Sequence, residues 1–559
     1  MAAGVALLPG TTAHAAPLAP AAGGVSVPAG GASKGASASL AGGVDKAREA
    51  AAKTFRSPAD RSVRSALPAG GNKAAGAQAQ SVAGNPDLAL AIEGVSYTAY
   101  GLMIDSTITS ADVPVELTID WGDGKVDKQS LKGSTVHGRE HVYAKLGTYN
   151  VTVTVTDAAN GVQAVNTLPF STLGSDFTPH APTRLLDTRN GTGAVAGKVA
   201  GRGTARVKVA GNAKVPAGVT AVVLNVTVTN TIADGHVTAF PGKGSVRPIT
   251  SNLNYTAGQS VPNLAIVPVG TDGYVELFNG GWSPVDLIAD VTGYFTPSEA
   301  SGYTSLSPVR AVDTREGLGT AKGQVPGQGS FEVQISGKNG VPAGIKAVAL
   351  NMTVTNPRED GHLIAYPSGQ QAPITSNVNF TAGQTVANAV IVPVGPDGKI
   401  AIRNGAWAGA DVVVDVVGYY SPDSAAAFLP IGPFRALDTR DPESWWPGGH
   451  LPARGYIPQM ASAEPAGVEA YALNATVTET KDSGFLSVAP GPFPWLVNDG
   501  PDAPQPPRPN SSVLNWTAGR TVPNLVQASD GEHGIIHFWN QGWKDADLIV
   551  DVFGVYETR

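Results

Sequence analysis

The sequence predicts an all-β protein made of several domains, and three observations support this fold class. The chain has 559 residues, enough for about three to five domains of ordinary size. Its apolar segments are short, alternate with polar residues and are rich in Val, Thr, Ile and Tyr, as in β-strands. The same landmarks occur three times, with the motif Asp-Thr-Arg repeating at intervals of 126 and 125 residues. A repeat of this length is a whole domain rather than a solenoid unit.

Composition excludes several classes of protein. Charged residues make up only 15% of the chain, which excludes coiled coils and long charged helices. The chain contains no Cys, so disulfides, Cys-ligated zinc and iron–sulfur clusters are excluded as sources of stability or chemistry. No run of about 18 uncharged apolar residues is present, and we expect no transmembrane segment. Packing and hydrogen bonds must therefore stabilise the fold.

The N-terminal region is the least globular part of the sequence. Residues 1–16 combine an apolar run with the small-residue pattern Ala13-His14-Ala15, as at a signal-peptidase cleavage site. No Lys or Arg precedes Lys34, so this segment is either a residual signal peptide or an Ala-rich tail. Residues 17–86 are rich in Ala, Gly and Ser and carry an excess of basic residues. We expect a disordered basic linker here and an extracellular or cell-wall-associated protein.

Residues 87–174 change in character to alternating strands and tight turns. Trp121-Gly-Asp-Gly124 supplies a turn, His141-x-Tyr143 and Gly147-x-Tyr149 follow, and the strand Val151–Asp157 has a strict period of two. In this order these motifs resemble a polycystic-kidney-disease (PKD) domain. The resemblance implies an immunoglobulin-like β-sandwich that acts as a spacer or binding module in a secreted protein.

Acidic residues in this segment could be taken for a metal site. Asp120, Asp123 and Asp127 lie close together in the sequence, as calcium ligands often do. An Asp-Gly turn accounts for Asp123 without a metal, and we expect no metal and no cofactor.

The remaining residues form three tandem β repeats, at 176–298, 303–423 and 428–557. Evenly spaced strands with Gly, Pro and Asn between them predict a β-sandwich or jelly roll for each. The third repeat has diverged, with extra Trp residues and a Pro-rich insertion. The three repeats resemble the Asp-Thr-Arg-bearing repeats of secreted actinobacterial, Streptomyces-type proteins, a resemblance that implies no particular activity.

The Asp-Thr-Arg motif has a structural and a functional interpretation. If the first and last strands of a repeat lie side by side, its Arg reaches an Asp of the last strand, which needs a cation once buried. The predicted ion pairs are Arg189–Asp290, Arg315–Asp415 and Arg440–Asp551. The functional alternative is a polar site for a sugar or a carboxylate.

Each repeat also carries an Asn-x-x-Trp hairpin tip. A half-exposed Trp beside an Asn amide suits a sugar ring, which stacks on the indole while the amide bonds its hydroxyls. The alternative is a Trp that folds back to plug the sandwich. The candidate ligand-binding residues are Asn279, Trp282, Asn404, Trp407, Asn540 and Trp543, joined by Trp445, Trp446 and Trp495 of the third repeat.

Catalytic motifs are weak in this sequence. No Gly-x-Ser-x-Gly elbow, His-Glu-x-x-His helix or Walker loop occurs. His533 and His537 on one strand would lie about 13 Å apart, too far to share a metal. We expect a non-enzyme that binds a polysaccharide or cell-wall polymer multivalently, and no nucleic acid. The alternatives are a structural or adhesive surface protein that binds protein partners or itself, and a targeting subunit of an extracellular hydrolase.

Overall fold

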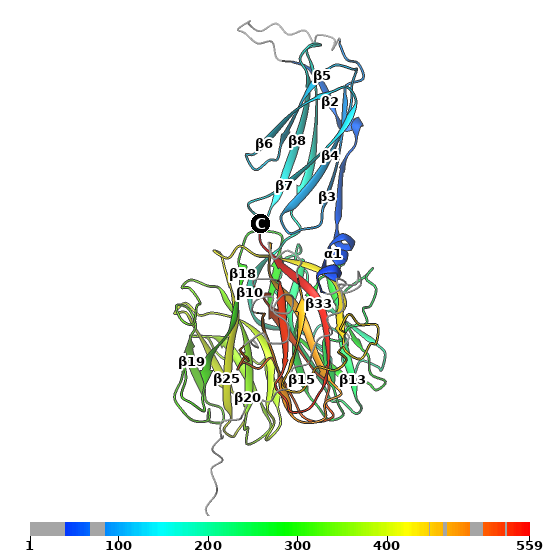
Figure 1. Ribbon diagram of the computed structural model, residues 1–559. Coiled ribbons are helices and arrows are strands. Elements are labelled where there is room, and N and C mark those ends of the chain that lie inside the picture. Colours follow the sequence, from blue (N-terminus) through cyan, green and yellow to red (C-terminus); the bar gives the residue numbers. More distant parts are fainter. Residues whose placement is uncertain (1–39, 68–83, 447, 462–466, 492–506, 532–533) are drawn as a thin grey trace, which may run out of the picture.

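The protein consists of a narrow N-terminal sandwich standing on a wider head (Figure 1). The structure, a computed structural model, describes residues 40–67, 84–446, 448–461, 467–491, 507–531 and 534–559. Within these residues the regular structure is almost entirely β, in separate four- and five-stranded sheets. The predicted all-β, multidomain fold class is therefore confirmed.

The N-terminal sandwich packs a four-stranded sheet, β1-β3-β4-β7, against a five-stranded sheet, β2-β9-β8-β5-β6. Alternate residues of each strand, such as Leu117 and Val153, point into a core closed by the buried rings of Trp121 and Tyr143. The strands are β1 (Lys53–Ser57), β2 (Val63–Ala66), β3 (Ala89–Ser96), β4 (Gly101–Thr109), β5 (Pro114–Asp120), β6 (Val126–Lys132), β7 (Thr135–Val142), β8 (Thr148–Asp157) and β9 (Val162–Ser171), with a short 3-10 turn η1 (Ala59–Arg61).

The prediction of a disordered linker over residues 17–86 is wrong for residues 40–67. β1 and β2 add one edge strand to each sheet of the N-terminal sandwich, through backbone hydrogen bonds that need few apolar side chains. Helix α1 (Leu40–Ala51) buries Leu40 and Val44 against the third repeat. Composition alone missed this because the partner surface lies almost 400 residues further along the chain. Residues 1–39 and 68–83 lie outside the described residues.

Each repeat of the head is a sandwich of two four-stranded antiparallel sheets. The inner sheets are β10-β17-β12-β15, β18-β25-β20-β23 and β26-β33-β28-β31, and the outer sheets are β11-β16-β13-β14, β19-β24-β21-β22 and β27-β32-β29-β30. Thus the first and last strands of every repeat pair with each other. All three repeats share one topology.

In the part of the chain that the structure describes, each repeat contains eight strands in the same order. In repeat 1 the strands are β10 (Asp176–Asp187), β11 (Thr204–Lys208), β12 (Ala221–Thr229), β13 (Gly235–Pro241), β14 (Leu253–Tyr255), β15 (Val261–Pro268), β16 (Tyr274–Asn279) and β17 (Asp286–Thr296). In repeat 2 they are β18 (Gly302–Asp313), β19 (Ser330–Gln334), β20 (Ala347–Thr355), β21 (Gly361–Pro367), β22 (Val378–Phe380), β23 (Val386–Pro393), β24 (Lys399–Asn404) and β25 (Asp411–Ser421). In repeat 3 they are β26 (Ala427–Asp438), β27 (Tyr456–Met460), β28 (Val468–Thr478), β29 (Gly484–Pro490), β30 (Leu514–Trp516), β31 (Val522–Ala528), β32 (Ile535–Asn540) and β33 (Asp547–Glu557).

The inner sheets are buried on both faces. On β12, Val222 and Leu224 point into the core of their own sandwich, whereas Ala221 and Val223 point into a second core shared by all three repeats. This explains why β12 is buried at eight of its nine positions and begins with four consecutive apolar residues, since a sheet with one solvent-facing side would alternate strictly. The three inner sheets therefore meet along a common axis.

Hydrogen bonds around this axis form a closed cycle. The amide nitrogen of Asn225 donates to the carbonyl of Ser376 at 2.7 Å, Asn351 donates to Ser512, and Asn474 donates to Ser251 at 2.7 Å. The donors come from repeats 1, 2 and 3 and the acceptors from repeats 2, 3 and 1. One chain thus builds a head with pseudo-threefold symmetry.

The two ends of the head differ. At the proximal end the N-terminal sandwich is docked through Tyr100, whose hydroxyl donates to the carbonyl of Ala425 at 2.8 Å. The Glu557 carboxylate accepts hydrogen bonds there from the Ala99 amide and from Arg48 of α1. At the distal end, loops 188–203, 230–234, 256–260 and 280–285 of repeat 1 and their equivalents leave the sheets, facing away from the N-terminal sandwich (Figure 1).

Candidate functional site

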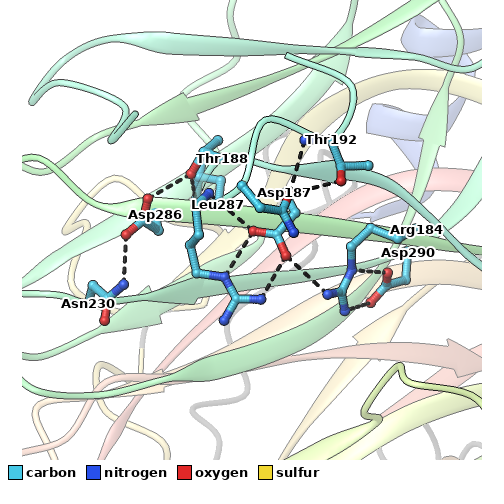
Figure 2. A network of polar contacts seen from close by, with 10 residues as sticks. Arg184, Asp187, Thr188, Thr192, Asn230, Asp286, Leu287 and Asp290 are labelled. Atoms are coloured by element: carbon cyan, nitrogen blue, oxygen red, sulfur yellow. Dashed lines mark hydrogen bonds and ion pairs between the residues drawn. The ribbon is translucent and has the colours of Figure 1, made fainter. Parts of the chain in front are cut away.

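The Asp-Thr-Arg motif lies where β10 ends, inside a buried polar network (Figure 2). The Arg184 guanidinium donates two hydrogen bonds to Asp290, at 2.8 and 3.2 Å, and one to Asp187 at 3.1 Å. The hydroxyl of Thr188 donates to Asp286 at 2.9 Å and accepts the backbone amide of Leu287. The network closes the first strand of the repeat onto the last.

The predicted ion pairs Arg189–Asp290, Arg315–Asp415 and Arg440–Asp551 are wrong. Asp290, Asp415 and Asp551 pair instead with an Arg that lies three residues before the Asp of each motif: Arg184, Arg310 and Arg435. Strand β10 ends at Asp187, so Arg189 lies beyond the paired part, whereas Arg184 stands directly opposite Asp290. The second Arg folds back onto its own motif, giving the pairs Arg189–Asp187, Arg315–Asp313 and Arg440–Asp438.

Two carboxylates of this network, those of Asp290 and Asp187, have opposite pKa shifts. Burial raises the pKa of Asp290 above its usual value, although Arg184 opposes the shift. The hydrogen bonds from Arg189 lower the pKa of Asp187, although burial opposes that shift. Asp187 is therefore a firmly ionised anchor, and both acids are engaged in holding the fold rather than facing a ligand.

The Trp of each hairpin tip is exposed at the distal end. Trp282 has 84% of its surface in solvent, Trp407 83% and Trp543 65%. None of them folds back to plug its sandwich. Because the three repeats are related by the pseudo-threefold axis, the head presents three indole rings on the same end.

The Asn of each tip is buried and cannot reach a ligand. The Asn279 amide nitrogen donates to the carbonyls of Ala200 and Ser283, and its oxygen accepts the hydroxyl of Tyr255. Asn404 and Asn540 have the same role and are likewise fully buried. The pairing of Trp with an exposed Asn, expected from the sequence, is therefore wrong, since the Asn forms the turn that projects the Trp.

A different polar side chain accompanies the exposed rings. The Arg202 guanidinium lies over the Trp282 ring, 5.3 Å from its centroid, and Arg454 lies 4.9 Å from the ring centroid of Trp543. Gln328 is the equivalent residue in repeat 2. All three have positive φ, between 55 and 61°, and sit between small residues. That local pattern, a polar residue within a Gly-rich turn, is the signal that sequence analysis overlooked.

The other Trp candidates of the third repeat lie elsewhere. Trp445 and Trp446 are partly buried and pack against the core of repeat 3, with their rings in an edge-to-face arrangement. Trp495 lies outside the described residues. The structure does not bring Trp445 or Trp446 together with the exposed Trp543.

A buried histidine distinguishes the third repeat. His537 on β32 is 1% exposed, and neither of its ring nitrogens has a hydrogen-bond partner among the described residues. Burial lowers its pKa to about 4. His533 lies outside the described residues.

We expect His537 to weaken the protein in acid. The unfolded chain binds a proton with a pKa near 6.5, whereas the folded chain binds it only near 4, so the stability contributed by the neutral ring is lost as pH falls between these values. The total loss approaches about 3 kcal/mol below pH 4. The measurement is urea unfolding of wild type and His537→Phe from pH 7 to 4. A parallel pH dependence in both proteins would contradict the assignment.

Neither a metal-binding group nor a membrane-spanning helix occurs among the described residues. Among the described residues, no group of three or more His, Asp or Glu side chains is placed to hold a metal ion. The Asp123 carboxylate pairs with His141 at 2.8 Å, and Asp127 accepts the indole N–H of Trp121 at 3.0 Å. None of the described helices has the length and apolar character needed to cross a bilayer.

The motifs of the N-terminal sandwich form one packed cluster. The Trp121 ring stacks on the His141 ring, with the two centroids 4.6 Å apart, and the Tyr143 hydroxyl donates to the Trp121 carbonyl at 3.1 Å. Residues 92–170 match the PKD domain. The PKD domain is typical of extracellular proteins, and it fits a protein built of non-catalytic modules. The resemblance of residues 176–557 to repeats of secreted actinobacterial proteins stays a prediction.

Comparisons of the whole chain add little. No curated protein sequence matches it. Similar solved structures include a chain from the Sulfolobus turreted icosahedral virus, with 9% identity over 68% of this chain and 90% of the viral one. A chain from a structure described as the triple jelly roll fold and turret assembly in an archaeal virus is also 9% identical, over 69% and 90%. Both have a TM-score of 0.14, too low to carry a functional argument.

Proposed function

We propose that this is an extracellular or cell-wall-associated, non-catalytic protein that binds a glycan or cell-envelope polymer through the distal end of its head. The PKD domain and α1 are docked at the proximal end, so neither of them covers the distal end, where a large ligand would bind. The observation that carries the proposal is the exposure of Trp282, Trp407 and Trp543 at equivalent positions there.

The chemistry of these tips suits a sugar. An indole presents an apolar face to the C–H groups of a pyranose, and Arg202 or Arg454 beside it supplies hydrogen-bond donors for the hydroxyls. A single exposed Trp binds weakly. Three of them held rigidly by one head bind a repeating polymer with avidity, because the second and third contacts form within one complex.

We expect the variant Trp282→Ala/Trp407→Ala/Trp543→Ala to lose binding to the polymer while staying folded. Its stability should change by about 0.5 kcal/mol or less per site, because the rings are mostly in solvent. The measurement is retention of the full chain on insoluble peptidoglycan, chitin, cellulose and starch. Each single substitution should weaken retention in part.

A matched control is the triple variant Val126→Ala/Val136→Ala/Val142→Ala, which removes exposed apolar side chains from the PKD domain instead. It should bind as wild type does. If wild type is retained on none of the four polymers, or if both triple variants lose binding equally, the proposal is overturned in favour of a surface protein that binds protein partners.

A further inference from the structure

The pseudo-threefold axis opens at the distal end into a cavity of about 900 Å³. Its rim is built by the same loop from each repeat, which we call the axial loops: residues 256–260, 381–385 and 517–521. Each axial loop reads Thr-Ala-Gly followed by Gln or Arg and Ser or Thr. Trp282, Trp407 and Trp543 do not line this cavity, so it is separate from the exposed Trp tips.

The cavity wall is rich in hydroxyl and amide groups. Thr256, Gln259, Thr381, Gln384 and Thr517 line it, and such groups both donate and accept hydrogen bonds. A site with this lining suits a ligand that carries many hydroxyls. Its volume lies within the range of about 300–1,000 Å³ that is usual for small-molecule sites.

A buried Asn behind the cavity wall has different hydrogen bonds in the three repeats. Asn263 is 3% exposed, and its side-chain oxygen has no hydrogen-bond partner among the described residues. The equivalent oxygens of Asn388 and Asn524 accept the backbone amides of Leu264 and Ala389, at 3.4 and 3.0 Å. The Asn263 oxygen is itself closed off from solvent, so it marks a departure from threefold symmetry in the cavity wall and is not a ligand contact.

One residue breaks the threefold symmetry of the rim. Arg520 stands where the other axial loops have Gln259 and Gln384. Its guanidinium crosses to repeat 1, donating to the Thr256 hydroxyl at 2.6 Å, and it has no carboxylate partner among the described residues. A guanidinium holds five N–H donors, so most of those of Arg520 remain available to an oxyanion.

The charged side chains that line the cavity are three Arg and Asp360, and two of the Arg are already paired with carboxylates. Arg184 and Arg189 are neutralised by Asp290 and Asp187. Arg520 is therefore the cation that a negatively charged ligand would meet.

We propose that the axial cavity binds a saccharide unit carrying one oxyanion, a carboxylate or a phosphate. Arg520 pairs with the oxyanion across the rim, and the hydroxyl and amide groups of the axial loops bind the sugar hydroxyls. This site is independent of the Trp tips. It gives the head a preference for acidic over neutral polymers.

The test is isothermal titration calorimetry of the full chain with four probes: glucuronate, glucose 6-phosphate, glucose and inorganic phosphate. We expect at least one of the two anionic sugars to bind at least tenfold more tightly than glucose or inorganic phosphate. Tighter binding of glucuronate would indicate a polymer that contains uronate, and tighter binding of glucose 6-phosphate a polymer that contains phosphate. The variant Arg520→Gln, which restores the residue of the other two loops, should lose at least tenfold in affinity for that sugar.

Several results would overturn the proposal: equal affinity for glucose and both acidic sugars, inorganic phosphate binding as tightly as glucose 6-phosphate, no binding of any probe, or no effect of Arg520→Gln in a protein of unchanged circular dichroism. The Trp282/Trp407/Trp543 triple alanine variant should retain the sugar affinity. The experiments therefore distinguish a loss of binding at the cavity from a loss of binding at the Trp tips.

Discussion

Replacing Arg184 with alanine should destabilise the head by about 3–5 kcal/mol, because it leaves the Asp290 carboxylate buried without its cation. Asp290 is 1% exposed, so water cannot replace the lost hydrogen bonds. The measurement is the free energy of unfolding in urea at pH 7. Arg310→Ala and Arg435→Ala should have effects of the same size in their own repeats.

The pH dependence of the Arg184→Ala defect tests its cause. Burial already raises the pKa of Asp290 in the presence of Arg184, and without the guanidinium the pKa rises further. The folded variant then takes up a proton as pH falls, which neutralises the buried charge. The difference in stability from wild type should therefore be largest at pH 7 and shrink in mild acid.

Arg189→Ala is the matched control, since this Arg belongs to the same motif. It removes a half-exposed partner of Asp187, which keeps hydrogen bonds from Arg184 and from the backbone amide of residue 189. We expect a clearly smaller loss than for Arg184→Ala. Equal losses in the two variants would contradict the pairing in the structure, and a larger loss for Arg189→Ala would favour the pairing expected from the sequence.

This network also shows how far sequence reasoning reaches. The repeat of Asp-Thr-Arg, together with a last strand bearing two Asp residues, was enough to predict that first and last strands pair and that an Arg neutralises a buried Asp. The partner was misassigned because the spacing of the residues does not reveal the register of the two strands. That register includes a bulge between Arg184 and Leu186, and the strand ends at Asp187. A choice between two Arg residues five positions apart depends on that geometry.

The arrangement of the repeats was not predicted, although a signal was present. The segment Ala221–Thr229 and its equivalent in repeat 2 each begin with four consecutive apolar residues, whereas a sandwich with one solvent-facing side would alternate. Burial on both faces requires another layer, and the layer here is the inner sheets of the other two repeats. The small or polar residues at the axis-facing positions, such as Ala221 and Asn225, allow the three sheets to approach closely.

The hairpin tips illustrate a second limit. An Asn before a turn is as well suited to hold the turn as to bind a ligand, and Asn279 does the former with all its polar atoms. The exposure of Trp282 could not be decided from sequence, because a loop Trp has room either to fold back or to project. The hydrogen bonds of the buried Asn279 hold the turn in a shape that projects the Trp282 ring into solvent.

Replacing Tyr556 with alanine should cost about 3–5 kcal/mol and weaken all three repeats together. Six rings, two from each repeat, pack around the proximal part of the axis: Phe177, Phe295, Tyr303, Tyr420, Phe428 and Tyr556. The ring centroid of Tyr556 lies 4.4 Å from that of Tyr303 and 5.1 Å from that of Phe428. Its hydroxyl is hydrogen-bonded to that of Tyr420 at 2.7 Å and to the Gln527 amide at 2.8 Å.

The backbone is shaped to admit these rings. A Cβ on Gly554 would lie 2.3 Å from the Phe428 ring, and one on Gly293 would lie 2.2 Å from Phe177. Glycine on the last strand of each repeat therefore makes room for the aromatic residue of the first strand. The axis is a packed core rather than a loose contact between finished domains.

The measurement is calorimetric unfolding combined with limited proteolysis of the head. If the axis couples the repeats, wild type unfolds them in one transition, and Tyr556→Ala lowers that transition as a whole and exposes sites in repeats 1 and 2 as well as 3. Tyr556→Phe keeps the ring contacts and loses only the hydroxyl, so its cost should be about 1–2 kcal/mol. Three separate transitions, with only the third one lowered by Tyr556→Ala, would show that the repeats fold independently. The geometry argues against that outcome, because each inner sheet would then expose an apolar face that only its two neighbours cover.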